Sequence, residues 1–208
     1  MRTDLNRIHI FRMTHIENIR HILQYGITHI SSPNANCNYL PIGDNSMIGS
    51  RNDFQLPNGK ILGQYIPFYF GDRMPMLYVI QKGYNGVPVT PPANIVYCIC
   101  SVQQIIDNNL PFVFTNGHAV DGLTEFFNES DISQIDNIID LKAIKAKYWR
   151  DANDLDLKRR KEAEFLIEAD IPPSAIVGWA VYNEVAKTKL EKMGIDATKI
   201  VVKPIYYF

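Results

Sequence analysis

Residues 158–168, KRRKEAEFLIE, change abruptly from a basic run to an apolar one. The basic half is compatible with a helix, whereas residues 165–167, FLI, are typical of a buried strand. Glu164 lies where the two halves meet. A carboxylate at the mouth of an apolar strand is partly desolvated and firmly held, which suits it to bind a hydroxyl or to stabilise a developing cation. A solvated charge at a helix end, paired with Lys161 or Arg160, is the alternative interpretation.

The bulk composition predicts a single soluble domain. The chain has 208 residues, of which 46% are apolar and 21% are charged, and its formal net charge is −1. This length allows one sizeable core. The near-neutral charge excludes a generally basic nucleic-acid-binding protein, so any contact with nucleic acid must come from a local patch. We therefore expect one domain over residues 1–208.

Cysteine usage and hydropathy predict a cytoplasmic protein. Cys37, Cys98 and Cys100 have no metal-ligand spacing, and an odd number of cysteines fits a reducing compartment. Cys98 and Cys100 stand two apart in an apolar run, which places both on one face of a strand as packing residues. No stretch has the length of a signal peptide's apolar core or of a membrane span, so we expect no membrane contact.

The N-terminal region predicts a strand followed by a helix. Thr14 and Glu17 have the spacing of a capping box at a helix N-terminus, and apolar residues then recur with helical spacing. Arg12, Met13 and Thr14 thus lie where a strand ends and a helix begins. Backbone N–H groups are free at such a place and attract phosphates or amide carbonyls.

Residues 31–64 are rich in Ser, Asn, Gly and Pro and show little periodicity. A polar segment of this length inside a compact domain is usually functional or disordered. We expect a loop that folds over a ligand, with a short helix over residues 46–52; a disordered surface insertion is the alternative. Arg51 is its most informative cation, because a fixed guanidinium binds phosphates or a base edge through two hydrogen bonds.

The rest of the chain predicts an α+β fold with a mainly antiparallel sheet. Strand patterns cover residues 65–70, 94–101, 111–115, 175–182 and 200–208, and helical patterns cover residues 102–108, 123–149 and 183–193. Residues 76–81 fit either a strand or a short helix. The elements lack regular β–α–β alternation, which argues against a parallel sheet. His118 lies in a turn, where a lone histidine is usually solvated.

Common cofactor, metal and catalytic motifs are absent from the sequence. It contains no GxGxxG, no phosphate-binding loop with its lysine, no HExxH, no CxxC and no GxSxG. What remains is a polar segment carrying Arg51, a turn with His118, and Glu164 at a strand edge. That set suits charge stabilisation in a displacement reaction, but spacing alone does not name the reaction.

Six stretches together resemble the DarT family of DNA ADP-ribosyltransferase toxins. They are IFRMTHIENIRHIL, YIPFYFGDRMPMLYVI, LPFVFTNGHA, Tyr148-Trp149, RRKEAEFLI and VVKPIYYF, and they occur in family order over essentially the whole chain. The resemblance implies an ADP-ribosyltransferase-like fold, with two mainly antiparallel sheets around an NAD cleft and flanking helices. It also implies transfer of ADP-ribose from NAD, as co-substrate and without a metal, to a base in single-stranded DNA, with release of nicotinamide.

The resemblance also implies roles for individual residues. Glu164 matches the catalytic glutamate, and Arg51 matches an arginine of the NAD-covering loop, residues 31–64, that acts on the target base. The residues that match NAD contacts are Arg12, Met13, Thr14, His21 and His29. His118 begins the substrate loop and helices, residues 116–164, that present DNA. Breaking the nicotinamide–ribose bond builds positive charge on the ribose, which a carboxylate stabilises. Because a guanidinium stays protonated, Arg51 suits orientation and charge stabilisation, and either it or Glu164 removes the proton of the base.

The acceptor and the partners are further expectations. Arg12 replaces the histidine of the thymine-modifying members, and together with IGDNSMIGSR, residues 42–51, it favours guanine over thymine. The alternatives are transfer to thymine, to RNA or to a protein side chain, and a catalytically silent nucleic-acid-binding module. Tyr148 and Trp149 either stack on unpaired bases or anchor their segment in the core. The family implies a neutralising macrodomain antitoxin that resembles DarG.

Overall fold

The structure, a computed structural model, describes residues 4–208, apart from the side chains of residues 45, 46 and 48. Within this range one sheet contains the strands in the order β5-β4-β6-β2-β1-β3-β7-β8. The strands are β1 (His9–His15), β2 (Ile66–Tyr69), β3 (Ile95–Ser101), β4 (Phe112–Thr115), β5 (Phe126–Phe127), β6 (Glu164–Ile167), β7 (Gly178–Val181) and β8 (Ile200–Val202). Neighbouring strands are antiparallel except β7 and β8, which confirms the α+β class.

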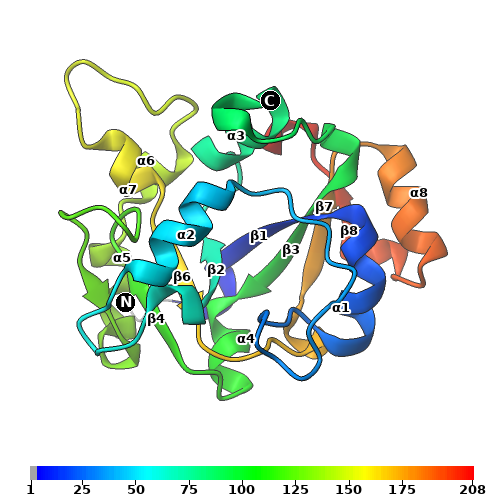
Figure 1. Cartoon of the computed structure of the whole chain (residues 1–208), viewed down its shortest axis with the longest axis horizontal. Coiled ribbons are helices and arrows are strands. Elements are labelled where there is room, and N and C mark those ends of the chain that lie inside the picture. The colour runs from blue at the N-terminus through cyan, green and yellow to red at the C-terminus, as the bar shows by residue number, and fades with distance from the viewer. Residues whose placement is uncertain (1–3) are drawn as a thin grey trace.

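Short helices surround this sheet. They are α1 (Ile19–Tyr25), α2 (Asn45–Asp53), α3 (Pro75–Lys82), α4 (Val102–Asp107), α5 (Ile135–Ile138), α6 (Leu141–Lys145), α7 (Leu157–Lys161) and α8 (Glu184–Lys192). Figure 1 shows α2 crossing in front of β2 and β6, with α1 and α8 beside the other end of the sheet. Among residues 4–208, none of the helices combines the length and the hydropathy needed to cross a membrane.

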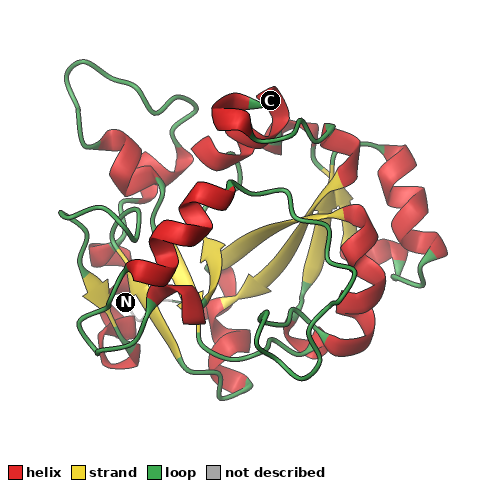
Figure 2. Ribbon diagram, in the orientation of Figure 1, coloured by secondary structure: helices red, strands yellow, loops and turns green. Residues whose placement is uncertain are grey.

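The sheet is nearly divided between β1 and β2. β1 pairs with β3 along its whole length, from His9 to His15, but it meets β2 through the single pair Phe11–Tyr69. The two groups of strands therefore diverge on either side of this contact (Figure 2). The expectation of two separate sheets was wrong, because this one pair joins the halves into a single mixed sheet.

Alternation along β6 sets the direction of its side chains. Phe165 and Ile167 belong to the large core, whereas Leu166 packs in a smaller cluster with Leu62 and Tyr65. Successive side chains of a strand point to opposite faces. Glu164 therefore shares the face of Leu166, which is the face that α2 crosses. Two-residue spacing also explains why Cys98 and Cys100 are buried together in the large core, as predicted.

Most of the predicted elements are present, with three differences and one open alternative decided. Residues 76–81 are helical, within α3. His15 caps the first helical turn by accepting a hydrogen bond from the Glu17 N–H, so the predicted Thr14 capping box was wrong. Residues 123–149 are not continuously helical, because Phe126–Phe127 forms the edge strand β5, which pairs with β4. The last strand ends at Val202, and a helical turn beginning at Pro204 follows it. The helix expected over residues 46–52 is confirmed as α2.

Candidate active site

The Glu164 side chain is fully buried and held by two donors. Its Oε1 accepts a hydrogen bond of 3.0 Å from the Ala119 backbone N–H, and its Oε2 accepts one of 2.8 Å from Arg51 Nη1. The alternative of a solvated carboxylate paired with its helix neighbours was wrong. Lys161 donates instead to the Ile144 carbonyl, and Arg160 pairs with aspartates.

A hydroxyl relay shapes the turn that reaches Glu164. The Glu164 N–H donates to Thr115 Oγ1 over 2.9 Å, and the Thr115 hydroxyl donates to the Gly117 carbonyl over 2.6 Å. Thr115 is the last residue of β4, so this relay bends the chain immediately after the strand. The bend aims the Ala119 N–H at the carboxylate.

Arg51 reaches the carboxylate from α2. Its side chain is 14% exposed, and the Glu164 side chain opposite it is 1% exposed. Arg51 Nη1 binds Glu164, whereas Nη2 is buried and has no acceptor among the described residues. A buried donor without an acceptor is costly, so this nitrogen is poised to bind an anionic or carbonyl oxygen.

Two further groups border the gap between β1 and β2. Arg12 Nη1 donates to the Pro67 carbonyl over 2.9 Å, which bridges the strands where their pairing has ended. Tyr69 lies opposite Glu164 in the β2–β6 pairing. Burial, followed by the charge on Glu164, raises the pKa of the Tyr69 hydroxyl far above its ordinary value. The hydroxyl therefore stays protonated at neutral pH and can donate a hydrogen bond.

His118 lies against the same charged cluster. Its backbone N–H donates to the Arg159 carbonyl over 2.9 Å. Burial lowers the pKa of its imidazole, with the charge on Glu164 opposing and that on Arg51 adding to the effect. His118 is therefore a half-buried, neutral imidazole rather than the solvated turn residue that is common at such positions.

The other predicted NAD contacts lie around and beyond the strand end. Met13 packs in an apolar cluster that includes Tyr97. Thr14 is buried and its hydroxyl accepts a 3.0 Å hydrogen bond from Asn18 Nδ2. His21 Nε2 lies 2.9 Å from the Asn34 carbonyl. His21 therefore contacts the polar segment of residues 31–64, whereas Met13 and Thr14 pack within the fold.

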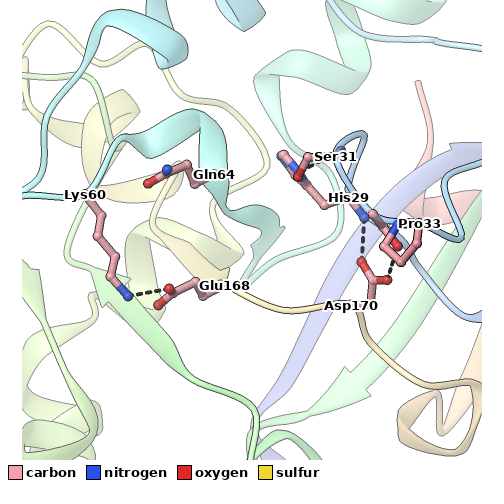
Figure 3. Close-up of a pocket in the computed structure, with 8 residues that line it drawn as sticks. His29, Ser31, Pro33, Lys60, Gln64, Glu168 and Asp170 are labelled. Carbon is pink, nitrogen blue, oxygen red and sulfur yellow. Dashed lines mark hydrogen bonds and ion pairs between the residues drawn. The ribbon is translucent and has the colours of Figure 1, made fainter.

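His29 lines a cavity of about 510 Å³ at the far end of β6. Figure 3 shows two groups of side chains facing each other across it: His29, Ser31, Pro33 and Asp170 on one side, and Lys60, Gln64 and Glu168 on the other. His29 Nε2 lies 2.8 Å from the Gly63 carbonyl, which ties the two sides together. Glu164 is not part of the lining. Glu168 follows it by four residues, so the cavity lies about 13 Å along the strand from Glu164, at roughly 3.3 Å per residue.

Tyr148 and Trp149 are not brought to Glu164. The Tyr148 side chain is 68% exposed and lies beneath the Lys147 ammonium. Trp149 instead contacts Tyr78 and Phe208, with ring centroids 5.6 Å apart in both cases. Trp149 is thus an anchor in an aromatic cluster, and Tyr148 is left as the exposed aromatic of this segment.

Three groups of the site were missed in the sequence. They are the Ala119 N–H, Tyr69 and Glu162. The first two are placed by loop geometry and strand register, for which the sequence carries no local signal. Glu162 caps the C-terminal end of α7, two residues before β6 begins, so strand alternation does not predict its direction.

Comparisons with known proteins identify the family of the chain. Residues 11–208 match the family model described as "ssDNA thymidine ADP-ribosyltransferase, DarT". A DNA ADP-ribosyl transferase of Thermus sp. (strain 2.9) is 33% identical over 199 residues, which cover 92% of this chain and 86% of the relative. A DNA ADP-ribosyl transferase–DNA ADP-ribosyl glycohydrolase fusion protein of Thermosipho africanus (strain H17ap60334) is 28% identical, and the match covers 96% of this chain and 49% of the fusion.

Solved structures agree over the full length. Thermus sp. 2.9 DarT in complex with ADP-ribosylated ssDNA superposes with a TM-score of 0.81 at 28% identity, covering 100% of both chains. The same protein in complex with NAD+ superposes with a TM-score of 0.78 at 27% identity, again over 100% of both chains. With a family match from residue 11 to the last residue and this shared fold, the chain belongs to the DarT family of DNA ADP-ribosyltransferases.

Proposed function

We propose that this chain is an enzyme that transfers ADP-ribose from NAD to a base of single-stranded DNA and releases nicotinamide. The observation that carries the proposal is the buried Arg51–Glu164 pair beneath α2, beside the gap between β1 and β2. A buried carboxylate held by an N–H and a guanidinium is preorganised, which is the condition under which such a group stabilises a developing charge most effectively.

The residues around the gap fit NAD as a substrate. Arg51 Nη2 is a buried donor without an acceptor among the described residues, and it suits a phosphate or ribose oxygen. Arg12 offers a second guanidinium at the same gap. The cavity beside His29 lies about 13 Å further along β6, a separation that an extended dinucleotide spans. We therefore assign NAD binding to Arg12, Arg51, Met13, Thr14, His21 and His29, under the cover of residues 31–64.

Glu164 carries the chemical step in this proposal. NAD supplies the ADP-ribosyl group and a leaving group that departs with the bonding electron pair. Glu164 binds a hydroxyl of the reacting ribose and stabilises the positive charge that builds there, a contribution of about 3–4 kcal/mol for a preorganised group. Arg51 holds the carboxylate in place and, as a permanent cation, orients the reactants. Tyr69 supplies a protonated hydroxyl beside them.

The acceptor is an unpaired base, and two bases are in question. The family model is described for thymidine, and the comparisons do not support a guanine preference. The substitution of Arg12 for histidine remains the reason to test guanine. His118 and the substrate loop that it begins form the proposed side of DNA entry, with the exposed Tyr148 as a stacking platform and Trp149 as its anchor.

The activity implies a neutralising partner and a cytoplasmic site of action. The Thermosipho africanus relative joins a transferase to a DNA ADP-ribosyl glycohydrolase in one chain. By analogy, we propose that this chain is a toxin whose antitoxin is a DarG-like macrodomain protein. An excess of such a glycohydrolase should reverse the modification.

The test is mass spectrometry of oligonucleotides that each lack one base, incubated with NAD and the wild-type protein. Addition of one ADP-ribosyl group to every strand that contains thymine, and to none without it, identifies thymine; the same pattern for guanine identifies guanine. Glu164→Gln serves as the inactive control, because it keeps the shape of the side chain and removes its charge. Intact NAD together with unmodified DNA and RNA, despite tight oligonucleotide binding, would instead indicate a silent binding module.

A further inference from the structure

Glu162 is a second buried carboxyl beside the catalytic one. It lies between the end of α7 and the start of β6, two residues before Glu164, and is 7% exposed. Its charge, like that of Glu164, acts on the hydroxyl of Tyr69 in the neighbouring strand. The Glu162 carboxyl therefore lies close enough to Tyr69 and to Glu164 to interact with both electrostatically.

The Glu162 carboxyl has no structural partner among the described residues. Among the described residues, none forms a hydrogen bond or an ion pair with it, whereas both oxygens of Glu164 have donors. Buried carboxyls without a structural partner are rare in proteins, because burial penalises the charged form. A buried, unpartnered carboxyl at the edge of an active site is thus available to a substrate.

The charges around Glu162 bring its titration near neutral pH. Burial is the main cause that raises the pKa of the Glu162 carboxyl to about 7, and Glu164 and Asp121 raise it further. Lys158 and Lys161 on α7 oppose this shift. A group that titrates near the working pH is matched to proton transfer, since a substantial fraction is deprotonated and that fraction is still basic.

The other groups of the cluster suit this step less well. A guanidinium is a hydrogen-bond donor without an acceptor, so Arg51 is not suited to take a proton. Glu164 already accepts hydrogen bonds at both oxygens and faces the sugar in the proposed function. Burial lowers the pKa of His118 and so makes it a weaker base, whereas the same burial makes Glu162 a stronger one.

We propose that Glu162 accepts the proton of the acceptor base during ADP-ribose transfer, an inference that rests on the proposed function. Thymine and guanine each carry a ring N–H beside a carbonyl. The ring nitrogen forms a bond to C1′ of the ribose as the C1′–nicotinamide bond breaks, and nicotinamide leaves with that electron pair. The N–H proton moves to a Glu162 oxygen and is later released to solvent. In this assignment Glu164 stabilises the charge on the ribose, and Glu162 accepts the proton of the base.

The deciding comparison uses Glu162→Gln, which keeps the shape and removes the basic group. With wild-type protein as reference, we expect kcat for transfer to an oligonucleotide to fall about 100-fold or more, the usual contribution of a general base. KM for the oligonucleotide should stay within threefold of the wild-type value. The rise in melting temperature that NAD causes should stay within about one degree of that of wild type. The wild-type rate should increase with pH through about 7, and the variant should lose this increase. Glu184→Gln, on the exposed start of α8, is the matched control and should behave as wild type.

A second readout does not depend on turnover. In protein labelled with ¹³C at the glutamate carboxyls, one resonance should titrate near pH 7 and be missing from Glu162→Gln. Transfer by the variant within threefold of wild type would overturn the assignment, as would the absence of any carboxyl that titrates between pH 6 and 8 (about one unit around the value near 7). Loss of the NAD-induced stabilisation would also overturn it, since Glu162 would then act on NAD or on the fold. An inactive wild-type protein would instead refute the proposed function itself.

Discussion

At the scale of single residues, burial gives identical side chains different tasks. Glu164 is fully buried and accepts a hydrogen bond at each oxygen, so its position is fixed by these partners. Glu162, two residues earlier, is nearly as buried but lacks such partners among the described residues. The first carboxylate is therefore suited to hold a charge in place, and the second to exchange a proton.

The Arg51–Glu164 pair should contribute to stability as a unit. Arg51→Ala or Glu164→Ala leaves a buried charge unpaired, so each should lower the free energy of unfolding by about 3 kcal/mol. The double variant should be less destabilised than the sum, by about 1–3 kcal/mol. Urea unfolding at pH 7.5 measures this coupling. The exposed Lys189–Glu17 pair is the control, with coupling below about 1 kcal/mol. Additive effects at Arg51 and Glu164 would contradict the geometry.

Glu162 should make stability fall as the pH rises. Its pKa is about 7 in the folded protein against 4.5 for a free glutamate, so the folded state binds more protons between these values. The stability that the protonated carboxyl contributes is fully present below pH 4.5, the pKa in the unfolded chain. It is lost as the pH rises through about 7, the pKa in the folded protein. Glu162→Gln does not titrate, so at pH 8 it should be more stable than wild type by up to roughly 3 kcal/mol, and at pH 4.5 by little. If wild type and Glu162→Gln had equal unfolding midpoints at each of the two pH values, the carboxyl would not be buried in solution.

At the scale of elements, α7 positions the turn after β4. Arg159 in α7 donates to Asn116 Oδ1 and to Thr124 Oγ1, both over 3.2 Å, and its guanidinium is fixed by Asp156. A methyl group on Gly117 would lie 2.4 Å from Arg159 Nη1. The absence of a side chain at position 117 thus lets the helix hold the turn that presents the Ala119 N–H to Glu164.

Gly117→Ala should therefore displace this turn. We expect faster hydrogen exchange at the Ala119 amide and a loss of transfer of about 100-fold, the usual effect of misplacing a reacting group by about 1 Å. Hydrogen exchange followed by mass spectrometry, together with the oligonucleotide assay, measures both. Gly122→Ala in the same loop is the matched control, because its added methyl group meets nothing within 4 Å. Equal exchange at Ala119 in both variants would show that the clamp is not required.

At the scale of the molecule, the nearly divided sheet is the feature that makes a site. Arg12 belongs to one group of strands and Glu164 to the other, and the halves share the single strand pair Phe11–Tyr69. Beyond this pair, β1 and β2 are not paired with each other, and in the proposed function NAD binds between them. A ligand that bridges the gap should strengthen the connection between the halves.

NAD should thus stabilise both halves together. At a concentration 100 times its Kd, a ligand that binds only the folded state adds about 2.7 kcal/mol. We expect a higher melting temperature, and slower hydrogen exchange in α2 and in residues 28–33. Protection on one side alone would argue against a substrate that reaches from Glu164 to the cavity beside His29. ADP-ribose and nicotinamide, added separately, divide the effect between the two ends of the gap.

The sequence by itself determined the local elements and the most important charge. The continuous apolar run of residues 94–101 became a strand that is buried on both faces, and Glu164 was recognisable from the apolar strand that follows it. The helix inside residues 31–64 was also predictable, although its contact with Glu164 was not. Residues 126–127 show the limit, since their place in the sheet depends on a partner strand elsewhere in the chain.

The tertiary structure alone decided what surrounds Glu164. Tyr69, Ala119 and Arg51 come from three segments far apart in the chain, and strand register and loop closure bring them together. A single residue pair between β1 and β2 decides whether the strands form one sheet or two, and no local sequence pattern predicts that pair. Burial followed from the same packing, and burial is what separates the chemistry of Glu162 from that of an ordinary surface glutamate.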